Sequence, residues 1–251
     1  MSTAALLELR GVTVAFGRRT SGAAPVLDGV DLDVREGEIL GVIGETGSGK
    51  TTLARTAVGL TAPRSGHVSF EGRRLTGLRG RGLREFRRTG RLQYAFQDPL
   101  RALDPDLTIR QSVAEPLAVA GGLGEAELTS RVDEALRTVG LDPALADRLP
   151  GALSGGQRQR ALLARAVVTG PRLLIADEPV SALDASNRNR VLALLDRLRR
   201  EQGMAIVIIS HDLSSLAGIA DRVAVLYRGR LVEQGPVRAV FGCSGRSNTA
   251  R

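Results

Sequence analysis

One short stretch of the sequence combines the residue types that proteins use to hold phosphate groups. Residues 44–51 read GETGSGKT, and Lys50 is the only lysine of the chain. Glycines let the backbone curl so that successive N–H groups point inward at phosphate oxygens. The stretch follows the apolar residues ILGVI and precedes a helical pattern, which is the context that a phosphate-binding loop requires. The sequence therefore predicts a nucleotide site here.

The polar residues of this loop have distinct expected roles. Lys50 offers a compact charge to the β- and γ-phosphates, and Thr51 offers a hydroxyl to Mg²⁺. An arginine at position 50 fails on shape, because its broad planar group suits open two-point contacts rather than a closed loop. The expected ligands are a nucleotide with β- and γ-phosphates and Mg²⁺, and the expected binding residues are Gly44, Glu45, Thr46, Gly47, Ser48, Gly49, Lys50, Thr51 and Thr52.

Two adjacent carboxylates end the apolar segment RLLIADEP at residues 172–179. Neighbouring residues of a strand face opposite ways, so the two can take different roles. We expect Asp177 to help hold Mg²⁺ and Glu178 to act as general base on the attacking water. Taken alone, the pair also fits a charged strand end in solvent.

His211 follows the apolar stretch AIVIIS and is expected at the carboxyl end of a strand. Ligands bind at this end of parallel sheets, so we expect His211 to contact the γ-phosphate. The other histidine, His67, lies in SGHVSF and is expected to be a surface strand residue.

The segment Leu153-Ser154-Gly155-Gly156-Gln157 precedes the helical stretch QRQRALLARAVV. A hydroxyl and two glycines at a helix N-terminus can form a second anion site. The same residues also fit an ordinary helix cap.

Hydrophobic periodicity predicts an α/β protein. Strands are expected at 6–16, 26–34, 38–44, 67–72, 173–177, 204–210 and 222–227, and helices at 49–60, 157–168, 186–200 and 213–220. Residues 109–140 carry helical periodicity and form an all-helical insert between the two α/β halves. The alternation of strands and helices predicts a mostly parallel sheet.

Composition limits the classes of partner. The net charge of +8 comes from arginine, and aromatic residues make up only 3% of the chain, with no tryptophan. Stacking platforms for single-stranded nucleic acid are therefore hard to build. The basic stretch LRGRGLREFRRTGR fits a solvated amphipathic helix better than a nucleic-acid patch. Cys243 is the only cysteine, and no apolar run is long enough to cross a bilayer.

Six motifs in order resemble the nucleotide-binding subunits of ABC transporters over about residues 5–240: GETGSGKT, Gln97 in FQDP, LSGGQ, LLIADEP, SALD at 181–184 and SHD at 210–212. The resemblance implies a P-loop NTPase core with a mostly parallel sheet, an N-terminal antiparallel β subdomain and a helical subdomain. It implies one ABC ATPase domain over 1–240, with the helical subdomain at about 76–150, and a tail over 241–251.

The resemblance also implies roles that the residues alone do not give. Two subunits, identical or related, pair head to tail, and Ser154, Gly155, Gly156 and Gln157 of one complete the ATP site of the other. Phe16 stacks on adenine, and Gln97 senses Mg²⁺ and the attacking water. Asp184 couples the two sites across the dimer. The helical subdomain contacts a membrane partner.

The wording FQDPLRALDPDLTIRQSVAEPL is similar to that of bacterial oligopeptide, dipeptide and nickel importers. This implies separate permease subunits, an extracytoplasmic solute-binding protein, no nucleic-acid partner, and a location on the cytoplasmic face of the inner membrane. Val180 stands where these importers have threonine, and their proline- and tyrosine-containing C-terminal extension has no counterpart here. Two alternatives remain open: an ABC ATPase acting on nucleic acid or ribosomes, and a subunit of a phosphonate-degrading complex.

Overall fold

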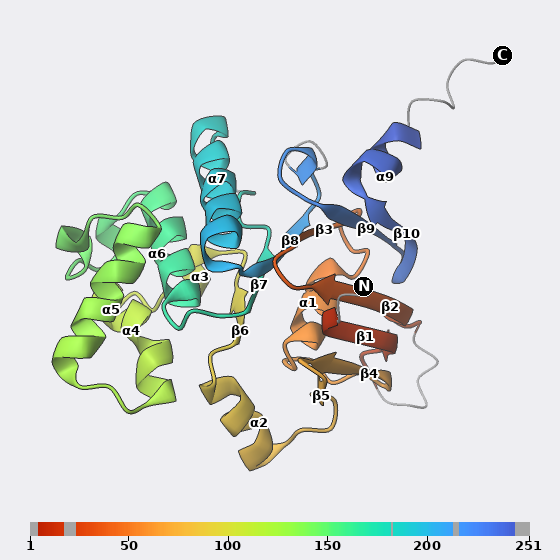
Figure 1. The fold of residues 1–251 in the computed structure, drawn as a ribbon, viewed down its shortest axis with the longest axis horizontal. Helices are drawn as coiled ribbons and strands as arrows, with labels where there is room; N and C mark the ends of the chain where they lie inside the picture. Colours follow the sequence, from red (N-terminus) through yellow and green to blue (C-terminus); the bar gives the residue numbers. More distant parts are fainter. Residues whose placement is uncertain (1–4, 18–23, 182, 213–215, 244–251) are drawn as a thin grey trace. The chain divides into compact units, whose positions relative to one another are not determined.

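The computed structural model describes residues 5–17, 24–181, 183–212 and 216–243. The chain divides into two compact units, whose helices and strands are labelled in Figure 1. Unit 1 comprises residues 1–78 and 199–251, and unit 2 comprises residues 79–198.

Unit 1 contains an antiparallel sheet with the strand order β2-β1-β4-β5. Its strands are β1 (Ala5–Val14), β2 (Leu27–Arg35), β4 (Ser65–Phe70) and β5 (Arg73–Arg74). Leu7, Leu9, Val12 and Val14 of β1 are all buried, because these side chains supply the core of the sheet. This sheet is the antiparallel β subdomain that the sequence resemblance implied.

The same unit holds strands in the order β10-β9-β3-β8. They are β3 (Ile39–Ile43), β8 (Ala205–Ser210), β9 (Arg222–Tyr227) and β10 (Arg230–Pro236). β3 runs parallel to both β8 and β9, whereas β10 is antiparallel to β9. Every residue of β3 and β8 is buried, as expected for parallel strands covered on both faces. Helices α1 (Lys50–Ala57) and α9 (Val237–Cys243) complete the unit.

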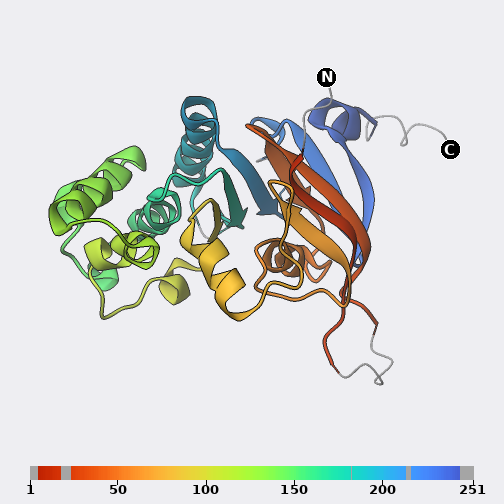
Figure 2. The ribbon, with the colours of Figure 1, turned by 60° about the horizontal axis from the view of Figure 1, so that its bottom comes forward.

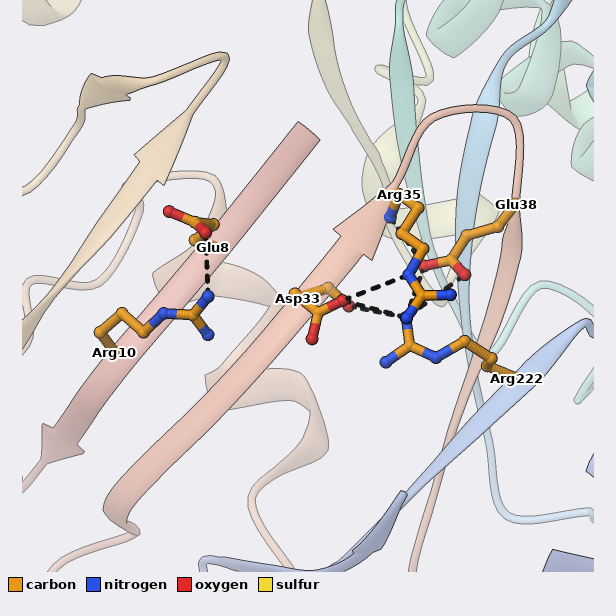
Figure 3. A network of polar contacts seen from close by, with 6 residues as sticks. All are labelled: Glu8, Arg10, Asp33, Arg35, Glu38 and Arg222. Carbon is orange, nitrogen blue, oxygen red and sulfur yellow. Dashed lines mark hydrogen bonds and ion pairs between the residues drawn. The ribbon is translucent and has the colours of Figure 1, made fainter. Parts of the chain in front are cut away.

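A charged network joins the two sets of strands within unit 1 (Figure 3). Arg222 of β9 lies 3.1 Å from the carboxylate of Asp33 on β2 and 3.0 Å from that of Glu38, next to β3. Glu38 also accepts the backbone N–H of Arg35 at 2.7 Å. The network fixes the start of β3, and β3 leads directly into the glycine-rich loop.

Unit 2 combines helices with two parallel strands, β6 (Leu92–Ala95) and β7 (Leu173–Asp177). The helices are α2 (Gly80–Arg88), α3 (Pro99–Ala102), α4 (Ile109–Ala120), α5 (Glu125–Thr138), η1 (Pro143–Leu145), η2 (Pro150–Ala152), α6 (Gly155–Val167) and α7 (Ala185–Gln202), whose last turn belongs to unit 1. Helices α4, α5 and α6 pack against one another (Figures 1 and 2). An ion pair of 2.6 Å between Arg165 on α6 and Glu115 on α4 supports this packing.

Most of the expected elements are confirmed, and the parallel arrangement is confirmed as well. The helical expectation for about 76–150 overlooks β6, a strand of four residues that is too short to give a periodic signal. Strand β10 and helix α9 were also not expected. The predicted helix at 213–220 begins in residues 213–215, which lie outside the described part of the chain. Among the described residues, no helix has the length and apolar character that a membrane span requires.

Candidate functional site

The glycine-rich loop connects β3 to α1 in unit 1, as predicted. Lys50 is buried, and its ammonium donates to the backbone oxygens of Gly44 at 2.7 Å and Glu45 at 2.8 Å. The loop thus wraps around its own lysine and fixes the direction of the charge. Glu45, Thr46 and Gly47 form the exposed rim of the loop.

Two of the glycines are required by shape. A Cβ at Gly44 would lie 2.2 Å from the backbone oxygen of Leu226, a clash that no rotamer can relieve. Gly49 has a φ of 107° and caps α1, and a Cβ there would lie 2.8 Å from the backbone oxygen of Val26. The backbone near the end of β9 and just before β2 therefore contacts the loop directly and leaves no room for side chains at these two glycines.

Ser48 gives the loop an unsatisfied donor. Its Oγ is buried and has no hydrogen-bond partner among the described atoms. A buried hydroxyl without a partner costs about 1–3 kcal/mol. Together with the buried ammonium of Lys50 and the first N–H groups of α1, this hydroxyl fits a loop built to receive phosphate oxygens.

His211 and Phe16 both lie in unit 1, just beyond the ends of β8 and β1, respectively. Ile43, the last residue of β3, is in register with Ser210, the last residue of β8. Gly44 and the exposed His211 therefore leave the same edge of the sheet side by side. Phe16 is 59% exposed and follows β1, whose Val14 accepts the N–H of Val26 at 2.7 Å.

In unit 2, Asp177 ends β7 and is almost fully buried, with 1% of its surface exposed. Its Oδ2 accepts the hydroxyl of Tyr94, on β6, at 2.6 Å. A buried carboxylate is costly unless hydrogen bonds compensate it, and this contact supplies one.

Glu178 lies one residue beyond the strand and has a φ of 47°, which is unusual for a residue with a side chain. The direction of its side chain therefore follows from this left-handed backbone. The expected reason for the separate roles of Asp177 and Glu178, strand alternation, was wrong, because Glu178 lies outside the strand. Gln97 donates its side-chain amide to Glu178 at 2.9 Å. Ser181 follows in a turn that bonds back to the Glu178 backbone oxygen.

The LSGGQ segment starts α6 as predicted. Ser154 is the N-cap, and its hydroxyl accepts the N–H of Gln157 at 3.3 Å. The side-chain oxygen of Gln157 accepts the N–H of Ser154 at 2.8 Å in return. This reciprocal pair of hydrogen bonds holds the start of the helix in place. The first two helical residues, Gly155 and Gly156, have no side chains that could cover their backbone N–H groups.

Asp184 starts α7, where it accepts the N–H of Asn187 at 2.9 Å and the Asn187 side-chain amide at 2.7 Å. These two hydrogen bonds, the backbone one first, hold the pKa of Asp184 below its usual range. The Asn187 side chain also lies beside Gly156 of α6, so one residue contacts both helix starts.

A sequence profile described as "ABC transporter" matches residues 27–181, more than half of the chain. The chain belongs to the ABC transporter family. Within that range lie the phosphate loop, Gln97, the LSGGQ segment and both carboxylates.

Curated relatives of this ABC protein carry importer names. A Brucella abortus protein described as a peptide import ATP-binding protein is 42% identical over 90% of this chain and 68% of its own length. The glutathione import ATP-binding protein GsiA of Salmonella typhimurium is 42% identical over 94% of this chain but only 38% of its own. The chain thus spans about two thirds of the first relative and well under half of the second.

Solved structures confirm the fold of this ABC ATPase. A dimeric post-hydrolysis structure of the ATP-binding cassette MJ0796 with ADP and Pi has a TM-score of 0.84 and 29% identity, covering 92% of this chain and 99% of that one. CbiO1 from Clostridium perfringens has a TM-score of 0.83 and 30% identity, covering 95% and 91%. The fold is therefore that of a P-loop ABC ATPase.

Two residues that contact the expected site residues, Tyr94 and Asn187, could not be predicted from the sequence. Tyr94 lies on the strand that periodicity did not reveal, so its contact with Asp177 could not be expected. Asn187 lies in a predicted helix, but its contacts with Asp184 and Gly156 depend on how two helix starts meet.

Proposed function

We propose that this ABC ATPase hydrolyses ATP to drive import of peptides or a related small solute across the bacterial inner membrane. The proposal rests on two different phosphate-binding features in one chain. In unit 1, the phosphate loop holds the buried ammonium of Lys50. In unit 2, the LSGGQ segment starts a helix whose first two residues are glycines, so no side chain covers their backbone N–H groups. Two copies paired head to tail would use both sites on each ATP.

The residues take the following roles in the proposal. Lys50 and the loop N–H groups bind the β- and γ-phosphates, and Phe16 stacks on adenine. Glu178 takes the proton of the attacking water, with Gln97 holding its carboxylate in place at 2.9 Å. His211 contacts the γ-phosphate.

Mg²⁺ is assigned to three oxygen donors: the Thr51 hydroxyl, the Gln97 side-chain oxygen and the Asp177 carboxylate. Hard oxygen ligands suit this ion, which takes few protein ligands and keeps several waters. When bound at these residues, Mg²⁺ would supply positive charge to offset the negative charge that develops during phosphoryl transfer. The buried position of Asp177 and its short contact with Tyr94 fit a carboxylate that is fixed in advance.

The import assignment rests on likeness. The names of the Brucella and Salmonella relatives support a peptide-type solute, and the dimeric MJ0796 cassette supports a two-subunit assembly. The partners in the proposal are a second ATPase subunit, permease subunits and an extracytoplasmic solute-binding protein. The chain would work on the cytoplasmic face of the membrane.

The Glu178→Gln variant tests the hydrolytic role. The change keeps the size of the side chain but removes the base, so turnover should stop while ATP-dependent dimerisation persists. Glu71→Gln is a matched control, because Glu71 also has a positive φ, of 50°, and also directly follows a strand. Unimpaired hydrolysis in Glu178→Gln would remove Glu178 from its role.

Purification from native membranes tests the transport role. Permeases and an external solute receptor should accompany the chain when it is captured in mild detergent. ATPase activity stimulated by duplex DNA or RNA, with steep salt dependence, would support a nucleic-acid ATPase instead. Capture with a soluble lyase would favour a phosphonate-degrading complex.

A further inference from the structure

Tyr94 makes a close contact that no step above uses. It lies on β6 in register with Ile175 of β7, two residues before Asp177. Its hydroxyl reaches the Asp177 Oδ2 at 2.6 Å, which is in the range of short, charge-assisted O–H···O⁻ hydrogen bonds. Asp177 is only 1% exposed, so bulk water cannot easily take the place of the Tyr94 hydroxyl. Loss of this hydrogen bond is therefore expected to be costly.

The ring of Tyr94 has a second neighbour. Its centroid lies 4.7 Å from that of Phe96, with the two planes at 85°. Phe96 directly precedes Gln97, and Gln97 donates to Glu178 at 2.9 Å. Tyr94 is thus connected to both carboxylates: it donates to Asp177 directly, and it packs against Phe96, which precedes the Gln97 that donates to Glu178.

The hydroxyl is the part of Tyr94 that packing does not explain. A phenylalanine would fill the same strand position and keep the edge-to-face contact with Phe96. Within the Tyr94 side chain, the O–H is the group that holds one oxygen of Asp177 and so helps to fix the direction of the carboxylate. Groups that orient a metal ligand in this way strongly affect metal affinity.

We propose that Tyr94 is a positioning residue, whose hydroxyl orients the Asp177 carboxylate for the divalent cation that accompanies ATP. The inference rests on the proposed metal role of Asp177. It predicts a residue that tunes the affinity for the cation and leaves the affinity for metal-free nucleotide unchanged.

The Tyr94→Phe variant tests the proposal through metal binding itself. Mn²⁺ replaces Mg²⁺, and the EPR signal of free Mn²⁺ is titrated in the presence of a non-hydrolysable ATP analogue. Affinity for Mn²⁺ should fall about 10-fold, the lower end for loss of a group that supports a ligand. Binding of the analogue in EDTA should not change. Tyr227→Phe is the matched control, since Tyr227 lies in unit 1 and stacks with Arg228.

The composition provides a second, spectroscopic measurement. The chain has no tryptophan and only two tyrosines, so Tyr227→Phe leaves Tyr94 as the sole tyrosine emitter. A hydrogen bond to a carboxylate alters tyrosine emission. Adding Mg²⁺ at constant ATP should therefore change the emission with the midpoint of metal binding, whereas ATP in EDTA should not. Asp177→Asn in this background should abolish the change.

The outcomes separate the two levels of the argument. Unchanged Mn²⁺ affinity in Tyr94→Phe, or tyrosine emission that does not change when Mg²⁺ is added, would overturn the role of Tyr94. Neither result would contradict the proposed ATP hydrolysis. If Asp177→Asn binds Mn²⁺ as the wild type does, the proposed metal role of Asp177 fails, and the inference fails with it.

Discussion

The side chain of Asn187, on α7, lies against Gly156, on the first turn of α6. A Cβ added to Gly156 would lie 3.3 Å from both Cγ and Oδ1 of Asn187. Asn187 cannot easily move away, because its side-chain amide is bonded to Asp184 at 2.7 Å. The second glycine of the LSGGQ motif is therefore restricted by its own chain, independently of any nucleotide.

The two glycines of that motif should respond differently to alanine. A Cβ at Gly155 meets nothing within 4 Å, so Gly155→Ala should stabilise the fold by up to about 1 kcal/mol through helix propensity. Gly156→Ala should lose most of that gain, because Asn187 must shift. Chemical denaturation of the single chain measures both. Equal stabilisation by the two changes would show that the contact is without consequence.

The acid sensitivity of the α7 start provides a second prediction. The pKa of Asp184 lies below its usual value of about 4, because the backbone and then the side-chain amide of Asn187 donate to the ionised form. The ionised carboxylate therefore adds stability above about pH 4, and this part is lost as the pH falls through the lower folded pKa. Asp184→Asn keeps the cap but cannot be protonated.

The thermal unfolding midpoint, measured at pH 7 and pH 3, tests this prediction. The difference between wild type and Asp184→Asn should shift in favour of the variant at pH 3. Asn187→Ala removes the side-chain donor and should reduce the acid sensitivity of the wild-type Asp184. A pH response identical in all three proteins would contradict the assigned cause.

The single lysine should not tolerate the residue used elsewhere for positive charge. Lys50 is enclosed by its loop, and an arginine there must either distort the loop or leave the backbone oxygens of Gly44 and Glu45. MgATP binding should weaken about 10- to 100-fold in Lys50→Arg, the equivalent of about 1.5–3 kcal/mol for a hydrogen bond to a charged group. Calorimetry measures it, with the exposed Arg55→Lys as control. Wild-type affinity in Lys50→Arg would refute the argument from shape.

The sequence was informative where chemistry and local geometry coincide. A glycine-rich loop between an apolar strand and a helix has few alternatives, and the structure places GETGSGKT there. The LSGGQ helix start follows similarly from the capping preferences of serine and glutamine. The apolar strands β3, β7 and β8 could be predicted because buried parallel strands are continuously apolar.

The features that escaped prediction depend on partners distant in sequence. Tyr94 meets Asp177 only because the short β6 pairs with β7, and four residues give no periodic signal. The left-handed backbone of Glu178 has no local cause in the sequence, since glutamate rarely adopts it. Such strained positions persist only when their surroundings impose them, and they are frequent at functional sites.

The buried charge network behind the phosphate loop provides the last prediction (Figure 3). The Arg222 side chain is 12% exposed and the Glu38 side chain 9%, so Arg222→Met leaves the carboxylates of Asp33 and Glu38 without their main counter-charge. Removing one partner of a buried pair costs about 3–5 kcal/mol.

Arg10→Met removes an arginine that is 43% exposed and paired with Glu8, where the expected cost is only about 0–1 kcal/mol. Denaturant unfolding of the two variants should differ accordingly. Similar losses would mean that solvent screens the Arg222 network as effectively as it screens the surface pair.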